Sequence, residues 1–257
     1  MTQALFRTDA YLRACDATVV AITDQGIVLD RTVFYPLGGG QAGDSGVLAL
    51  ADSRALPIAD TRKGKDSEGR FTEEICHIPA SDGNGSLSIQ EYCAQQGLAV
   101  GQTVTARIDW DRRHRLMRFH TATHLLCHLV PWPVNGCSIT PDAARLDFVM
   151  TDALDKDALT ADLARLVAAA HPVTVGRITD AELDANPALV KSMSVQPPRG
   201  TGHVRTIRIG AADAQAIDFQ PCGGTHVART GEIGRIVLDK VEKKGRQNRR
   251  ISISLAE

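Results

Sequence analysis

Aromatic residues are scarce in this sequence, at 4% of its 257 positions. Base stacking on aromatic platforms is therefore not the expected way for the protein to hold a nucleic acid. An excess of one charge sign is also lacking, because 29 basic and 30 acidic residues give a formal net charge of -1. A nucleic-acid partner would have to be held by local basic patches.

Paired cysteines and long apolar runs are missing as well. The six cysteines contain no C-x-x-C pair, which indicates free thiols in a reducing compartment. No apolar run reaches the length of a membrane span, and the N-terminus lacks the basic and apolar stretches of a secretory signal. We expect a cytoplasmic protein with no membrane partner.

Several catalytic motifs are absent. The run Pro36–Gly46 contains five glycines but lacks a Gly-Lys-Ser/Thr ending and a following helical pattern, so it is neither a P-loop nor a dinucleotide fingerprint. No histidine precedes Ser45, which excludes a trypsin-like nucleophile in Gly43-Asp-Ser-Gly46. The glycines alone favour a tight double turn between strands; the alternative is a surface where backbone amides meet a ligand.

The first region of the chain is predicted to be β-rich. Short runs of Val, Ile, Leu and Thr are separated by turn residues at Ala17–Ile22, Gly26–Phe34, Gly46–Leu50, Phe71–Ile78 and Thr103–Ile108. This pattern is typical of a small barrel or sandwich. We expect polar loops over Asp60–Arg70 and Ser81–Gly97, and a boundary after Ile108, where the pattern becomes helical.

The second region opens with a helix that carries two histidines four residues apart. Leu116 and Phe119 follow helical spacing, and Pro131 ends the helix. His120 and His124 then lie on one face, one turn apart, where two imidazoles can share a metal ion. A packed, hydrogen-bonded pair without a metal explains this stretch equally well.

A second pair with the same spacing lies far downstream, in Cys222-Gly-Gly-Thr-His226. Together the two pairs supply three nitrogens and one sulfur, a set that suits tetrahedral zinc. A zinc site that only stabilises the fold remains an alternative, because structural sites also use four protein ligands. His128 adds a third imidazole to the helix, and no role is assigned to it.

The remaining elements alternate between strands and helices. An amphipathic pattern predicts a helix over Thr151–Ala170, and Thr179 with Glu182 forms a capping box for a shorter helix. Asn135–Pro141 is predicted to be a polar loop. Strands are predicted at Arg145–Val149, Val204–Ile209, Ala216–Phe219, Ile233–Val241 and Ile251–Leu255.

Basic residues gather in two places. Arg115 and Arg118 lead into the histidine helix, and Lys243, Lys244 and Arg246 lie in a hairpin between the last two strands. Such charges usually belong to solvated surfaces. Beside a metal site they become candidate phosphate contacts.

The order of these motifs resembles the editing region of alanyl-tRNA synthetases. It is still more similar to the free-standing AlaX proteins of the medium-length class, which resemble that region without an aminoacylation part. The resemblance rests on Phe34-Tyr-Pro-x-x-Gly-Gly-Gln-x-Gly-Asp44, on His120-x-x-x-His124 and on Cys222-Gly-Gly-Thr-His226-x-x-x-Thr-Gly231. It covers nearly the whole chain, and the last of these motifs is the most specific.

The resemblance implies an α+β fold in two domains. Residues 1–108 would form a small β-barrel similar to those of translation factors, with the glycine-rich motif. Residues 109–257 would form an α+β editing domain of the alanyl/threonyl-tRNA synthetase type. The ligands of one zinc ion would be His120, His124, Cys222 and His226, which match the family's pattern position by position.

The implied activity is trans-editing, in which the ester that joins a wrong amino acid to tRNA(Ala) is hydrolysed without ATP. Serine would be the main misattached amino acid and glycine the second, while Ala-tRNA(Ala) is spared. The glycine-rich motif, which includes Gly39, Gly40 and Gln41, is associated in the family with this discrimination. Zinc would polarise the ester, activate a water or orient the substrate.

The roles of individual residues are less constrained. Gln41, Thr121 and Thr123 are candidate catalytic residues, with helix packing and a turn hydrogen bond as the alternative roles. The candidate substrate and tRNA contacts are Gly39, Gly40, Gln41, Arg115, Arg118, Lys243, Lys244 and Arg246. No stable protein partner is expected.

Two other classes of protein remain open at this stage. A tRNA-binding module with structural zinc would bind tRNA in a salt-dependent way without releasing an amino acid. A zinc-dependent hydrolase of small esters would be indifferent to tRNA and to salt. A zinc peptidase is disfavoured, because no Glu lies between His120 and His124.

Overall fold

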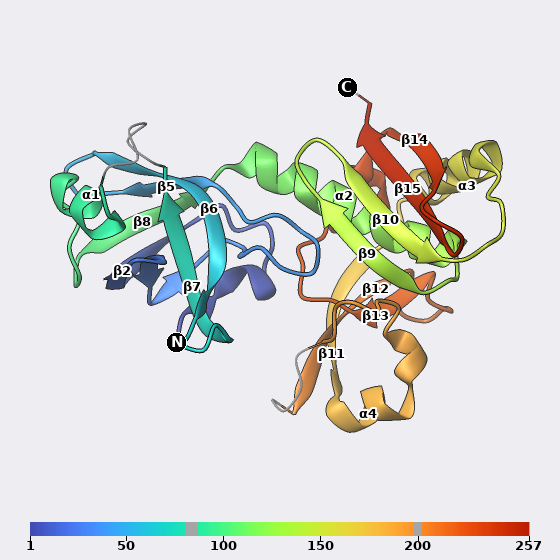
Figure 1. Ribbon diagram of the computed structural model, residues 1–257, viewed down its shortest axis with the longest axis horizontal. Helices are drawn as coiled ribbons and strands as arrows, with labels where there is room; N and C mark the ends of the chain where they lie inside the picture. Colours follow the sequence, from blue (N-terminus) through green and yellow to red (C-terminus); the bar gives the residue numbers. More distant parts are fainter. Residues whose placement is uncertain (81–86, 198–201, 257) are drawn as a thin grey trace. The chain divides into compact units, whose positions relative to one another are not determined.

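The computed structural model describes residues 1–80, 87–197 and 202–256, which form two compact units of mixed α and β structure (Figure 1). The first unit comprises Met1–Gly38 and Ala42–Arg113, and the second comprises Gly39–Gln41 and His114–Glu257. The expected boundary lies after Ile108. The observed division falls five residues later along the helix, after Arg113, and it assigns Gly39–Gln41 to the second unit.

Six strands of the first unit close into a barrel in the order β2-β3-β7-β6-β5-β8. Their bounds are β2 Ala14–Thr23, β3 Gly26–Leu29, β5 Gly46–Ala49, β6 Ala55–Lys65, β7 Phe71–Pro79 and β8 Thr103–Ile108. Apolar side chains alternate into the barrel; in β8, Val104, Ala106 and Ile108 are buried while Arg107 is exposed. The unit also contains β1 (Gln3–Ala4), η1 (Leu5–Arg7), β4 (Arg31–Thr32) and α1 (Ile89–Gln95).

Two predicted loops of the first unit contain regular structure. The loop expected over Asp60–Arg70 is wrong in its first half, because β6 continues to Lys65. Register shifts against β7 interrupt the apolar alternation of this strand, which hides it in the sequence. Within Ser81–Gly97, residues 81–86 lie outside the described residues. The capping box of Ser88 and Glu91 begins α1 just after them.

A buried ion pair joins the first turn of α2 (Trp110–Leu129) to Asp44, the last residue of the glycine-rich motif. The side chains of Arg113 and Asp44 are 0% and 1% exposed. The Arg113 guanidinium donates to both carboxylate oxygens and to the carbonyls of Ala10 and Val33. Asp44 also accepts a hydrogen bond from the Tyr35 amide at 2.6 Å. Buried charges of this kind are tolerated only when they are paired and hydrogen-bonded, so Asp44 is a structural residue.

The second unit contains a four-stranded sheet in the order β14-β15-β10-β9 and a three-stranded sheet in the order β11-β12-β13 (Figure 1). The first sheet consists of β9 Val134–Ile139, β10 Ala144–Val149, β14 Ile236–Lys243 and β15 Asn248–Leu255. The second consists of β11 Val173–Thr179, β12 His203–Ile209 and β13 Asp218–Pro221. The further helical elements are α3 Lys156–Ala168, α4 Asp180–Ala185, η2 Pro187–Leu189 and η3 Thr230–Ile233.

Helix α2 begins at Trp110, where the sequence pattern becomes helical, but it is buried on more sides than the sequence predicts. Asp109 caps its first turn by accepting a hydrogen bond from the Arg112 amide at 3.1 Å. Every residue from Phe119 to Cys127 is buried, although the apolar pattern suggested burial on one side only. The polar side chains in this stretch therefore need internal partners.

Three other expectations for the second unit are corrected. Asn135–Pro141 is not a loop, because β9 occupies most of it. Gly136 of this strand lies so close to Asp147 that a Cβ atom would come within 2.8 Å of the carboxylate. Strand β11 was not predicted; most of its residues are exposed, so it lacks an apolar pattern. Helix α3 is shorter than expected, since Asp155 caps it. Within the described residues, no helix combines the length and apolar character of a membrane span.

Candidate metal site

Four side chains from two distant parts of the chain meet in the second unit. His120 and His124 lie on α2, and Cys222 and His226 lie in the loop that follows β13. One potential ligand atom from each side chain lies within 4.8 Å of all the others. The Cys222 Sγ atom is 3.4 Å from His120 Nε2 and 3.3 Å from His226 Nε2. The structure thus brings the four predicted ligands together.

Each of the three imidazoles has an oxygen atom beside its Nδ1. His120 Nδ1 lies 2.7 Å from Gln41 Oε1, and His124 Nδ1 lies 2.8 Å from Asp218 Oδ2. His226 Nδ1 lies 3.2 Å from Thr121 Oγ1, whose own proton is donated to the Met117 carbonyl at 2.9 Å.

These partners settle which nitrogen carries the proton. An amide oxygen, a carboxylate and a hydroxyl already used as a donor can only accept, so each Nδ1 is the donor. In the neutral rings the lone pair is then at Nε2, on the side of the Cys222 thiol, where a cation could bind. Oxygen acceptors behind the imidazoles are characteristic of metal-binding histidines. The residues present therefore fit a metal ion.

The electrostatics of the cluster favour a thiolate. Burial raises the pKa of the Cys222 thiol, but the neighbouring His120 and His226 outweigh burial and hold the pKa well below its usual value. Burial lowers the pKa of His124, yet the hydrogen bond to Asp218 more than compensates and raises it to about 9. Because a metal would displace the proton on Nε2, metal affinity should fall as pH falls.

Gln41 connects the glycine-rich segment to the cluster. Its side chain is fully buried, and its Oε1 accepts from the Thr225 amide at 3.1 Å as well as from His120. Its Nε2 donates to Thr225 Oγ1 at 2.9 Å. Gln41 therefore orients one imidazole and fixes the loop that supplies Cys222 and His226. Its predicted contact with substrate stays a prediction.

Two glycines are required by close packing around Gln41. A Cβ atom on Gly224 would collide with the His120 ring and come within 3.0 Å of Gln41 Oε1. A Cβ atom on Gly40 would come within 2.7 Å of Cys137 Sγ, and the φ angle of Gly40 is +85°. These contacts explain why the backbone at both positions carries no side chain. Gly39 also has a positive φ, but nothing lies within 4 Å of its Cβ position.

A carboxylate that the sequence analysis missed lies behind His124. Asp218 is buried and accepts hydrogen bonds from His124, from Gln220 Nε2 at 2.9 Å, and from Lys191 Nζ. Asp218, Gln220 and Cys222 occupy alternate positions along one strand and its exit. That spacing places their side chains on one face, and it is the sequence pattern from which the role of Asp218 could have been predicted.

The two candidate threonines differ in what they contact. Thr121 accepts from His226 and from the Val227 amide at 3.2 Å, so it supports a ligand. Thr123 donates to the His120 carbonyl at 2.7 Å, within the helix. The predicted contacts of these two hydroxyls with substrate stay predictions. His128 is exposed and does not belong to the four-residue group.

The predicted tRNA contacts fall into two groups. Arg115 and Arg118 donate to the backbone carbonyls of Pro141 and Ile233, at 2.7 and 2.8 Å, and so help to hold the second unit together. The residues of the hairpin between β14 and β15 are exposed: Lys243, Lys244 and Arg246. Their contact with tRNA stays a prediction.

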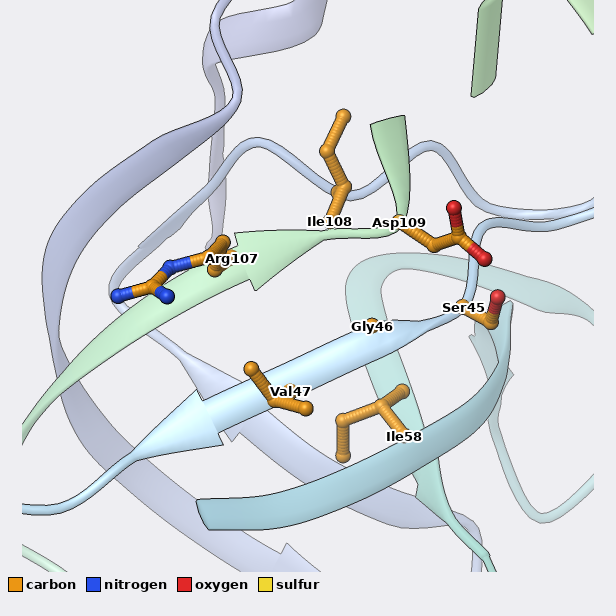
Figure 2. A pocket seen from close by; sticks show the side chains of 7 residues that line it. All are labelled: Ser45, Gly46, Val47, Ile58, Arg107, Ile108 and Asp109. Atoms are coloured by element: carbon orange, nitrogen blue, oxygen red, sulfur yellow. The ribbon is translucent and has the colours of Figure 1, made fainter. Parts of the chain in front are cut away.

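A separate hollow of about 340 Å³ lies in the first unit (Figure 2). In Figure 2 the side chains of Val47 and Ile58 lie at its floor, with Arg107 toward one end and Asp109 toward the other. Its complete lining is Ser45, Gly46, Val47, Ile58, Arg107, Ile108 and Asp109. None of the predicted site residues lines it, so it is distinct from the four-residue cluster.

Comparison with known proteins gives the class of the chain. Residues 204–252, which include Cys222 and His226, match the family described as the threonyl and alanyl tRNA synthetase second additional domain. The chain is also 31% identical to an alanine–tRNA ligase of Ignicoccus hospitalis over 94% of its own length, which is 24% of that protein. Both matches relate the chain to a domain of the alanyl and threonyl tRNA synthetases.

The full-length relatives give the family. The chain is 33% identical to the alanyl-tRNA editing protein AlaX-M of Methanosarcina acetivorans, over 100% of both chains. It is 32% identical to the AlaX-M protein of Saccharolobus solfataricus, over 98% of both. The chain belongs to the AlaX family of alanyl-tRNA editing proteins.

Proposed function

We propose that this protein is a trans-editing deacylase that hydrolyses the ester of mischarged tRNA(Ala), chiefly Ser-tRNA(Ala) and also Gly-tRNA(Ala), while sparing Ala-tRNA(Ala). The observation that carries the proposal is the cluster of three imidazoles and one thiol, in which every Nδ1 is hydrogen-bonded to an oxygen and one ligand atom of each side chain lies within 4.8 Å of the others. Membership of the AlaX family supports hydrolysis of an aminoacyl ester as the reaction and tRNA(Ala) as the partner.

The metal proposed for the cluster is one zinc ion. His120, His124, Cys222 and His226 would hold it, and such a mixed nitrogen and sulfur set suits zinc best. When bound, zinc would supply Lewis-acid stabilisation of the ester or of a water molecule. The protein contributes the fixed orientation of the ligands, through Gln41, Asp218 and Thr121.

Discrimination of serine from alanine requires a polar contact. Alanine fits wherever serine fits, so only a site that must hydrogen-bond the serine hydroxyl can reject alanine strongly. Gln41, Thr121 and Thr123 were the candidates. Thr121 and Thr123 already donate to backbone carbonyls at 2.9 and 2.7 Å. Because Thr121 also accepts from His226 and from the Val227 amide, the Thr123 oxygen is the better candidate acceptor for a substrate hydroxyl.

The proposed binding of tRNA involves exposed cations. Lys243, Lys244 and Arg246 are the candidates at the hairpin, with Arg115, Arg118 and the segment Gly39–Gln41 nearer the cluster. We further propose that the protein acts in the cytoplasm without a stable protein partner. Residues 1–108 are proposed to be a barrel domain like those of translation factors, and 109–257 an editing domain.

The decisive experiment compares the release of amino acid from Ser-tRNA(Ala) and Ala-tRNA(Ala) with trace amounts of enzyme. Fast release of serine with alanine spared is the expected result. Release from neither substrate, by folded and zinc-loaded protein, would refute the deacylase and favour a tRNA-binding module. Equal rates on a small seryl ester with or without tRNA, and at any salt concentration, would favour a small-ester hydrolase.

A further inference from the structure

Two arginines lie directly opposite each other on neighbouring strands of the three-stranded sheet. Strands β11 and β12 are antiparallel, and Arg177 pairs with Arg205 in their register. Side chains at such positions point to the same face, with Cβ atoms about 5 Å apart. Like charges in this arrangement repel each other, and two guanidinium groups side by side can both contact one anion.

The two arginines share a sheet face with residues of the metal site. Ile207 pairs with Gln220, and Ile209 pairs with Asp218. Because side chains alternate along β12, Arg205 lies on the same face as these four residues. Asp218 accepts the Nδ1 proton of His124, and Gln220 Nε2 donates to Asp218. The arginine pair therefore belongs to the face of the sheet that turns toward the cluster.

Arg205 also contacts the loop that carries two of the proposed ligands. Its Nη1 donates to the carbonyl of Cys222 at 2.6 Å and to the carbonyl of Gly224 at 3.0 Å. These bonds hold the guanidinium against the loop. An anion bound between the two arginines would thus lie beside the Cys222 loop.

The side chains of β11 near Arg177 are exposed to solvent. Arg177 is exposed, and Val175, one step along the same face, is 52% exposed. Within the described part of the chain, no carboxylate forms an ion pair with Arg177. Asp218, a buried carboxylate on this face, is already engaged with His124, Lys191 and Gln220.

We propose that Arg177 and Arg205 form an anion site for a backbone phosphate of the RNA strand, close to the 3′ end that carries the ester. Guanidinium groups match phosphate oxygens in a forked geometry, and a bound phosphodiester would offset the repulsion between the two cations. The choice of RNA rests on the proposed function. An ester attached to the end of an RNA strand brings that strand's own phosphates to this loop.

Binding of an uncharged RNA hairpin with a single-stranded 3′ end, followed by fluorescence anisotropy, tests the site without catalysis. Arg177→Ala should weaken binding about three- to tenfold and lower the slope of log K against log salt by roughly 0.7 to 0.9. Arg177→Lys should keep most of the affinity. Arg165→Ala removes an equal charge from an exposed position on α3 and should change nothing.

Thermal unfolding separates this role from a structural one. If Arg177 and Arg205 repel each other in the protein without RNA and Arg177 has no structural role, Arg177→Ala leaves the melting temperature unchanged or raises it. A lowered melting temperature together with unchanged RNA affinity would overturn the proposal. Wild-type protein that does not bind the hairpin would also overturn it.

Kinetics separate the anion site from the reaction itself. With Ser-tRNA(Ala), Arg177→Ala should raise KM and leave kcat unchanged. With 3′-O-seryl-adenosine, which has no phosphate, the variant and the wild type should be equal. Reduced RNA binding by the variant, with no deacylation by either protein, would support the anion site and refute the proposed function. Unchanged KM and RNA affinity would refute the anion site alone.

Discussion

Buried histidines have different hydrogen-bond partners in the two units. In the barrel, His77 is fully buried, and its Nδ1 donates to the Ile27 carbonyl while its Nε2 accepts from Thr32 Oγ1, both at 2.8 Å. Burial lowers its pKa to about 4. In the second unit, the Nδ1 atoms of His120, His124 and His226 are hydrogen-bonded to oxygens. The Nε2 atoms of His120 and His226 lie beside the Cys222 thiol instead.

The difference shows what makes a buried histidine available for chemistry. Both nitrogens of His77 are satisfied, so the ring is a neutral structural group. In the cluster, an oxygen at Nδ1 orients each imidazole, and the Nε2 atom of each ring is the one that could bind a metal ion. Burial alone does not identify a histidine as a metal ligand. The useful sign is that one ring nitrogen is hydrogen-bonded to an oxygen while the other points toward further potential ligand atoms.

The largest effect should come from removing a proposed ligand. His124→Ala should abolish stoichiometric zinc binding and reduce deacylation at least about 1,000-fold, because the whole contribution of the metal is lost. His77→Gln should keep its zinc. Metal analysis by mass spectrometry and single-turnover deacylation measure both variants. Full zinc content in His124→Ala would contradict the four-ligand site.

Acid should destabilise the protein through His77. Its folded pKa of about 4 lies below its ordinary value of 6.5, so between these values the unfolded state binds a proton that the folded state does not. The contribution of neutral His77 is complete above pH 6.5 and is lost as pH falls toward 4, by roughly 3 kcal/mol in total.

Urea unfolding at pH 7 and pH 4.5 measures this loss. The pH dependence in wild-type protein should exceed that in His77→Gln, which has no titrating group at this position. Equal dependence in the two proteins would mean that His77 does not contribute.

The carboxylate behind His124 should affect metal affinity more than stability. Asp218→Asn keeps the shape of the side chain but weakens its hold on the His124 proton, and zinc affinity should fall about 10- to 100-fold. Competition with a chromophoric chelator gives the affinity. An unchanged affinity would show that the hydrogen bond at 2.8 Å does not orient the ligand.

The smallest effect should separate the two helix threonines. Thr121→Val removes the acceptor of His226 and should lower zinc affinity about tenfold. Thr123→Val removes only a bond to the His120 carbonyl within the helix and should leave affinity within about twofold. The same chelator competition compares the two. Equal losses would mean that the contact of Thr121 with His226 is not specific.

The ligands could be predicted from the sequence, but their supports could not. Spacing of four residues is a local property of a helix or loop, so His120, His124, Cys222 and His226 were identifiable as a set. Asp218 and Gln41 reach the imidazoles only through tertiary contacts, across 94 and 79 residues of sequence. Spacing contains no information about such contacts.

Secondary structure could likewise be predicted only where a local sequence pattern marks it. Strand β8 matches its prediction, Thr103–Ile108, because its apolar residues alternate without interruption. The predicted loop Asp60–Arg70 overlaps the second half of β6, where bulges shift the alternation, and the sequence does not predict β11, because most of it is exposed. Sequence patterns reveal the elements that bury one regular face, and they fail where packing is irregular or absent.

The position of Gln41 in the sequence limits which fragments of the chain can form the complete site. A fragment that begins at Asp109 contains all four proposed ligands, yet it lacks the amide that accepts the His120 proton and binds both the backbone and the side chain of Thr225. The gene segment that encodes the ligands is therefore not a self-sufficient module. The amide that orients one ligand comes from a segment far upstream in the sequence, between β4 and β5.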